Sequence, residues 1–135
     1  MRRVAGRLLI LAVAIVLAGF AAIALHDEDE CQVQSRRMVD VGLGTLPARA
    51  QYADAFLDAC RGSHVLAITA NGLAGRKKTG LAVRIADEAI RREPENYESW
   101  VALATALRQR GLGRAAERAL REARRLNPRF GQGPG

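Results

Sequence analysis

The sequence predicts an all-α protein, and three observations support that class. Ala and Leu supply most of the apolar residues, with Arg and Glu as their usual polar partners, and this composition favours helices. Only six of the 135 residues are aromatic, and no run alternates apolar and polar residues as a half-buried strand does. Apolar residues instead recur at helical spacing, for example at Ala48, Tyr52, Ala55, Phe56 and Ala59.

The N-terminal region, residues 1–25, predicts a membrane anchor. Three arginines open the chain, and Leu8–Leu25 then forms an uninterrupted run without a charge. A helix of that length is about 27 Å long, close to the hydrocarbon thickness of a bilayer. The acidic run Asp27–Glu30 follows. Arginines before the span and acids after it predict a cytoplasmic N-terminus and an extracytoplasmic C-terminal domain at the cell membrane.

A cleaved signal peptide is the alternative for the same region, with the small residues Ala22-Ile23-Ala24 as its cleavage site. The remainder would then be a secreted soluble protein. Both alternatives imply export. The richness in Ala, Arg and Gly, with only two Lys, is typical of a GC-rich bacterial genome, so we expect the compartment to be a bacterial cell envelope.

Export decides how the charge of the chain is interpreted. The net charge is +7, and residues 97–135 hold eight Arg against three Glu, a balance that indicates nucleic-acid binding in some proteins. An exported domain faces the envelope rather than the chromosome, so we expect no nucleic-acid partner. The same compartment permits disulfides, and Cys31 and Cys60 are the only cysteines. A disulfide between them is expected, with two free thiols as the alternative.

Glycines and prolines divide the rest of the chain into segments. We expect an acidic juxtamembrane linker over residues 26–46, which includes a short helix from Ser35 to Val41. A helical domain over residues 47–128 and a flexible tail over residues 129–135 follow. The helices expected in the domain, with Ser63 as the cap of the second, are residues 47–60, His64–Leu73, Leu81–Arg92, Tyr97–Arg110 and Arg114–Leu126.

The chain contains an internal period of about 34 residues, which separates Pro94 from Pro128, and each proline follows a helix. The small and apolar residues between them are Trp100, Leu103, Ala104, Leu107, Gly111, Ala116, Leu120 and Ala123. This pattern over residues 97–130 resembles the tetratricopeptide repeat (TPR) family. One period upstream, residues 63–96 resemble a degenerate repeat through Leu66, Ala70, Leu73, Ala82, Ala86, Ala89 and Pro94.

The resemblance implies a short solenoid of helical hairpins, covered at one end by the helix at residues 47–60. It also implies a groove lined by the first helix of each repeat. Carried onto this sequence, the groove positions are His64, Ala67, Asn71 and Ala74, then Glu98, Val101, Thr105 and Arg108. Asn71 matches an asparagine with which relatives hold a peptide backbone or carboxylate, and Arg108 supplies a cation suited to a partner carboxylate.

The last expected helix carries a basic face formed by Arg114, Arg118, Arg121 and Arg125, which recur at i, i+4, i+7 and i+11. One interpretation is a solvated outer face of the terminal repeat. The other is contact with anionic lipid headgroups or with an acidic partner.

No residue pattern in the sequence predicts catalysis, a metal site or a cofactor. The two histidines, His26 and His64, lie far apart in the sequence, so the residues that a zinc site or a hydrolytic triad needs are not present. Gly72–Thr79 departs from a phosphate-binding loop because Lys77 stands where that motif needs glycine. We therefore expect a non-catalytic, membrane-anchored scaffold that binds a protein partner in the envelope. The alternative is an accessory subunit of an envelope enzyme.

Overall fold

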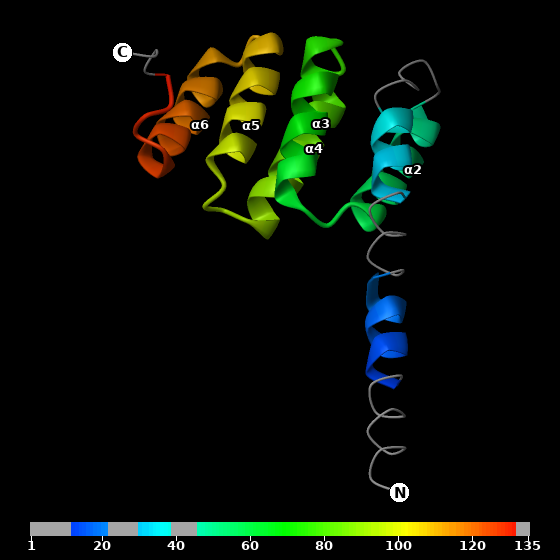
Figure 1. The fold of residues 1–135 in the computed structure, drawn as a ribbon. Helices are drawn as coiled ribbons and strands as arrows, with labels where there is room; N and C mark the ends of the chain where they lie inside the picture. Colours follow the sequence, from blue (N-terminus) through cyan, green and yellow to red (C-terminus); the bar gives the residue numbers. More distant parts are fainter. Residues whose placement is uncertain (1–11, 22–29, 39–45, 132–135) are drawn as a thin grey trace, which may run out of the picture.

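The computed structural model describes residues 12–21, 30–38 and 46–131 of the chain. Helices joined by turns are the only regular structure in these ranges, which confirms the all-α class (Figure 1). Residues 12–21 and 30–38 are helical, and the helices that follow are α2 (Leu46–Ala59), α3 (Ser63–Gly75), α4 (Thr79–Arg92), α5 (Tyr97–Gln109) and α6 (Gly113–Leu126). The helices from α2 to α6 begin and end within a residue or two of the positions predicted from the sequence.

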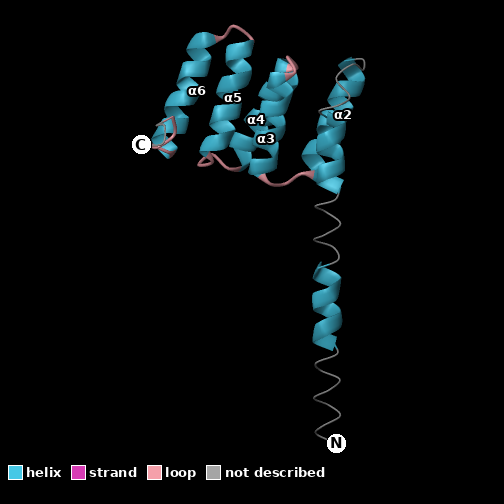
Figure 2. Cartoon of the chain, turned by 45° about the horizontal axis from the view of Figure 1, so that its top comes forward, coloured by secondary structure: helices cyan, strands magenta, loops and turns pink. Residues whose placement is uncertain are grey.

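Two helical hairpins repeat along the chain. The first is α3 with α4 and the second is α5 with α6, and every boundary of the second hairpin follows its counterpart in the first by the same interval. Helix α5 packs against both α3 and α4, so the hairpins form one continuous stack (Figures 1 and 2). That interval equals the separation of Pro94 and Pro128, so the period first seen in the two prolines is a period of the backbone.

The turns inside the hairpins repeat with the same offset. In the first, the Lys78 amide donates to the Leu73 carbonyl over 2.9 Å, and in the second the Leu112 amide donates to the Leu107 carbonyl over 3.0 Å. These bonds close left-handed C-terminal caps of the Schellman type. The left-handed residue is Lys77 (φ 60°) in the first turn and Gly111 (φ 76°) in the second. Only the second turn has a glycine at this position, and glycine adopts the left-handed conformation without strain.

A further pair of helices, residues 30–38 and α2, covers the N-terminal end of the stack. Cys31 and Cys60 form a disulfide with an S–S distance of 2.04 Å, which confirms the predicted pairing. Met38 is buried in the shared core, and the Ser35 hydroxyl lies 2.9 Å from that of Thr69 on α3. The helical domain therefore begins earlier than predicted, because residues 30–38 belong to it and not to a linker over residues 26–46. Part of the predicted Ser35–Val41 helix lies outside the described residues.

The core is built mainly from alanine. Its largest fully buried side chains are Phe56, Leu66, Leu73 and Ile85, which lie on α2, α3 and α4. The buried residues of α5 and α6 are all small: Ser99, Ala102, Ala104, Ala106, Ala116, Ala119 and Ala123. Small residues let two helix backbones approach closely, while the longer Trp100, Leu103, Leu107 and Leu120 are half-buried around that contact. The second hairpin thus gains less from apolar burial than the first.

The helix at residues 12–21 lies within the predicted span Leu8–Leu25, whose remaining residues are outside the described ranges. Every residue of this helix is exposed, including Val13, Ile15, Leu17 and Phe20. Within the described ranges, no helix combines the length and the apolar character needed to cross a membrane.

Two glycine variants test the left-handed turn. Gly111→Ala places a Cβ at φ 76°, a conformation that costs an L-residue about 1–2 kcal/mol, so we expect a net loss of about 1 kcal/mol in unfolding free energy. Gly75→Ala, in the last turn of α3, should instead stabilise by about 0.5–1 kcal/mol. Neither new Cβ has an atom within 4 Å, so packing does not differ between them. Denaturant unfolding followed by the fluorescence of the single Trp measures both changes, and equal effects would contradict the argument.

Candidate functional site

A shallow hollow of about 220 Å³ lies between α3 and α5, the first helices of the two hairpins. Four of the predicted groove positions line it: Ala67, Asn71, Glu98 and Val101. Three further residues line it that the sequence interpretation did not include, namely Ile68, Tyr97 and Phe130. The predicted groove is thus partly assembled, and its walls are more apolar than expected.

The wall of the hollow is largely apolar. Ile68 keeps 58% of its surface exposed, although it is a large apolar side chain in the middle of a helix. Beside it, the rings of Tyr97 and Phe130 lie 5.9 Å apart at a tilted angle, a favourable aromatic geometry. Phe130 belongs to the predicted flexible tail. Residues 129–131 of that tail are described, and of these Phe130 packs through this contact, while residues 132–135 lie outside the described ranges.

Asn71 and Glu98 are the polar residues of the α3 and α5 helices that line the hollow, and Asn71 is the uncharged one. It is exposed, and its amide makes no hydrogen bond with any residue that the structure describes. A primary amide both donates and accepts, which is the chemistry that pairs with a peptide backbone. An apolar wall next to a free amide therefore suits an extended peptide that buries one apolar side chain.

The other predicted groove residues have different roles. His64 pairs through Nδ1 with the Glu98 carboxylate, because the repeat places the two residues side by side on α3 and α5. The Thr105 hydroxyl donates to the Val101 carbonyl of its own helix over 2.9 Å. Arg108 lies in the last turn of α5 and pairs with Glu117 of α6 at 3.4 Å. Four of the predicted groove positions do not line the hollow: His64, Ala74, Thr105 and Arg108.

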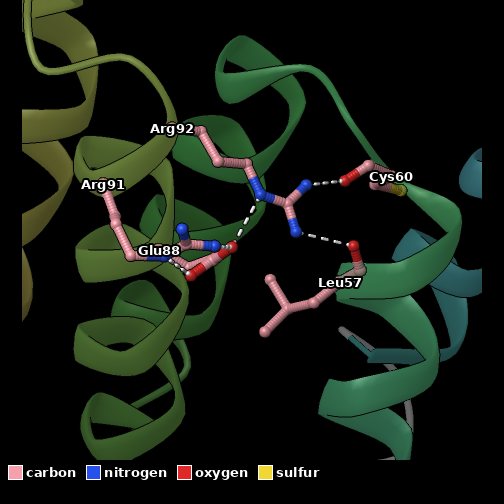
Figure 3. Close-up of polar contacts among 5 residues, drawn as sticks. All are labelled: Leu57, Cys60, Glu88, Arg91 and Arg92. Carbon is pink, nitrogen blue, oxygen red and sulfur yellow. Dashed lines mark hydrogen bonds and ion pairs between the residues drawn. The ribbon is translucent and has the colours of Figure 1, made fainter.

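Arg92 fastens α2 to α4, as Figure 3 shows. Its guanidinium donates to the Cys60 carbonyl over 2.5 Å and to the Leu57 carbonyl over 2.8 Å. Helix α2 has no basic residue in its own last turn, so a side chain of α4 satisfies the carbonyls at its end. Glu88 holds the Arg92 guanidinium in place over 2.7 Å and also pairs with Arg91. This contact fixes the segment that carries the disulfide.

The pKa values of two neighbouring carboxyl groups of α4 are shifted in opposite directions. Hydrogen bonds from Arg91 and Arg92 lower the pKa of Glu88 to about 2 from its usual 4.5. Burial raises the pKa of Asp87 above its usual 3.8. Glu88 therefore favours the folded state when it is ionised, whereas ionised Asp87 opposes folding.

A second polar cluster joins α3 to the turn before α5. The Ser63 hydroxyl donates to the Glu93 carboxylate and accepts from the Asn96 amide over 2.9 Å. The sequence predicted Ser63 as the N-cap of α3, but Gly62 takes that position and makes no side-chain cap. The Ser63 side chain is instead buried against the next hairpin, and the cluster locks α3 to the turn that leads into α5.

The predicted basic face is present on α6. Arg114, Arg118, Arg121 and Arg125 are all exposed, and of the four only Arg125 pairs with a carboxylate of the described residues, that of Glu122 at 2.8 Å. Cys31 and Cys60 lie at the other end of the stack, beside a hollow of about 730 Å³ that residues of both charge signs line, such as Arg36 and Asp58. The predicted site residues therefore belong to three separate features: the hollow between α3 and α5, the basic face of α6, and the disulfide at the other end of the stack.

Within the described ranges, no group of three or more His, Cys, Asp or Glu side chains is placed to hold a metal ion. No protein-family model matches the chain, and a search of curated proteins finds no relative.

The low pKa of Glu88 leads to a pH prediction. Because the folded-state pKa lies below 4.5, the stabilisation is fully present above pH 4.5 and is lost as the pH falls toward about 2. Glu88→Gln should therefore be less stable than the native chain near neutral pH, and the difference should shrink at about pH 3. The denaturant midpoints of the native chain and of Glu88→Gln, compared near neutral pH and at about pH 3, measure this difference.

Glu122→Gln is the matched control, because Glu122 pairs with Arg125 inside one exposed helix. An exposed pair of this kind contributes little, so the control should change the midpoint only slightly. A pH-independent loss in Glu88→Gln would show that the residue acts through packing and not through its charge.

Proposed function

We propose that this protein is a non-catalytic, membrane-anchored scaffold of the tetratricopeptide-repeat type, which binds a protein partner on the extracytoplasmic side of a bacterial cell membrane. The constant offset between α3–α4 and α5–α6, in both helix boundaries and turn hydrogen bonds, supports the repeat assignment. It adds to the resemblance carried by Trp100, Ala104, Ala116 and Pro128.

The observation that carries the binding function is the composition of the hollow between α3 and α5. A side chain such as Ile68, 58% exposed, costs solvation free energy unless a partner covers it, and Asn71 offers an unpaired amide beside it. A hollow of about 220 Å³ accommodates one apolar side chain and a few backbone atoms. We therefore expect recognition of a short extended segment, with weak affinity because the groove contains few repeats.

Two features support the proposed location. The helix at residues 12–21 exposes an apolar surface all around, which suits a lipid environment, and it lies inside the uncharged run Leu8–Leu25. The Cys31–Cys60 disulfide is the chemistry of oxidising, extracytoplasmic compartments. Closing the loop between these two cysteines contributes about 3–4 kcal/mol in the chain-entropy model.

Site-specific photocrosslinking in intact cells tests the binding site. A benzophenone amino acid at position 68 should crosslink to one discrete envelope protein, and Asn71→Ala should reduce the yield severalfold. Position 52 is the matched control, because Tyr52 is aromatic, exposed and outside the hollow. Equal crosslinking from positions 68 and 52, or none from position 68, would refute the proposed site. A change in the turnover of a captured enzyme would identify the chain as its accessory subunit.

Reporter fusions test the proposed topology. A reporter that is active only outside the cytoplasm should be active when fused after Gly135, and one that is active only in the cytoplasm should be inactive there, because the arginines before Leu8 remain inside. The opposite pattern would overturn the topology and remove the argument against a nucleic-acid partner. Release of the fusion into a soluble fraction would indicate signal cleavage.

A further inference from the structure

The arginine face of α6 is a feature that the proposed scaffold function does not use. Arg114, Arg118, Arg121 and Arg125 lie on one side of the helix, opposite the buried Ala116, Ala119 and Ala123. With a rise of about 1.5 Å per residue, they form a row about 17 Å long. All four are exposed, and this row is longer than any single carboxylate or phosphate.

The charge of this row is not balanced within the structure. Arg114, Arg118 and Arg121 make no ion pair with any residue in the described part of the chain. Arg110, Arg124 and Arg129, which are exposed beside the row, likewise form no ion pair there. On the row itself, Arg125 pairs with Glu122, and this is the single ion pair that the row makes with described residues.

Comparison with α4, the equivalent helix of the first hairpin, shows that the fold does not require this charge. At the corresponding positions, one period earlier, Arg84 pairs with Asp54 at 2.5 Å and Arg91 pairs with Glu88. Arg121 corresponds to Asp87, so a carboxylate of the first hairpin is replaced by a guanidinium in the second. The hairpin geometry is the same while the charge changes from compensated to uncompensated.

The composition around the row favours a lipid surface over a protein partner. Specific protein interfaces are built around buried apolar and aromatic anchors. Among the described residues near the row, the only large exposed apolar side chain is Leu112, 46% exposed at the start of the helix. A flat anionic bilayer needs no such anchor, because positive charges spread along its plane are sufficient. Guanidinium groups also bind phosphate oxygens with two parallel hydrogen bonds.

We propose that the arginine face of α6 docks on anionic phospholipid headgroups of the membrane that holds the N-terminal anchor. This inference rests on the proposed function, because the anchor keeps the domain close to the bilayer and raises the local concentration of headgroups. Each arginine near such a surface strengthens binding about fivefold at moderate salt. Docking would fix the orientation of the helical stack on the membrane.

The test uses the full chain in lipid nanodiscs of phosphatidylcholine alone, or of phosphatidylcholine with phosphatidylglycerol. Phenylglyoxal modifies accessible arginines, and peptide mass spectrometry reads the rate at each residue. Arg114, Arg118, Arg121 and Arg125 should react severalfold more slowly in the phosphatidylglycerol discs. The protection should disappear at high salt, where the Debye length falls to about 3 Å.

Paired variants sharpen the experiment. Arg118→Gln with Arg121→Gln should reduce the ratio of docked to free protein about 25-fold, so Arg114 and Arg125 lose their protection. Arg84→Gln with Arg91→Gln is the matched control on α4, because it removes the same charge from arginines that already have partners. Unchanged far-UV circular dichroism confirms that both variants fold.

The outcomes separate the inference from the function on which it rests. Equal reactivity in the two kinds of disc, with the protein still embedded in both, would overturn lipid docking and leave the anchor intact. Failure of the protein to remain with phosphatidylcholine discs would refute the anchor itself. Protection of the row by soluble polyglutamate or duplex DNA, but not by phosphatidylglycerol, would also overturn the inference and assign the face to an acidic protein or to nucleic acid.

Discussion

Close approach of helices across small side chains is the constraint on which the rest of the structure depends. Ala70 and Ala82 are fully buried in the first hairpin, and Ala104 and Ala116 are buried at the corresponding positions in the second. An alanine contact brings two backbones together but buries little apolar surface per residue, so each hairpin is weakly stabilised by its own core. Helical repeats therefore rely on their neighbours, and about three are usually needed for a stable stack. The pair formed by residues 30–38 and α2 provides the missing layer.

That additional layer is held by specific contacts as well as by apolar burial, since Phe56 and Met38 also enter the core. The disulfide joins its two helices, and Arg92 of α4 binds the carbonyls of Leu57 and Cys60 at the point where α2 ends. Glu88 is ionised over most of the pH range because two guanidinium groups surround it, and its charge keeps Arg92 oriented. A covalent bond and a charge-assisted cap thus act on the same short segment. These contacts fix the end of α2 against α4.

The sequence alone predicted the helices and their period well, because their signals are local. Glycines and prolines mark the turns, and apolar residues at helical spacing mark the faces of α2 to α6. A helix was predicted from Ser35, but the helical residues 30–34 and the packing of this segment into the domain were missed. The segment is polar, with Met38 as its one buried residue, and its position depends on partners that are distant in the sequence. The same limit explains Ser63, whose partner Glu93 lies beyond the next helix, and Arg108, which turned toward Glu117.

Within the candidate site, the residues at equivalent positions of the two hairpins could be predicted from the sequence repeat. The apolar side chains that complete the hollow could not. Asn71, Glu98 and Val101 follow from register, since the first helices of successive hairpins lie side by side. Whether an apolar side chain is buried or exposed depends on which other elements pack against it. The sequence repeat therefore does not predict that Ile68 and Phe130 line the hollow. Their exposure and position define the hollow on α3 and α5, whereas the arginine row lies on α6. Because no residue belongs to both, occupation of one surface does not block the other. A stack of this size therefore has room for two independent contacts, one with a peptide and one with a charged surface.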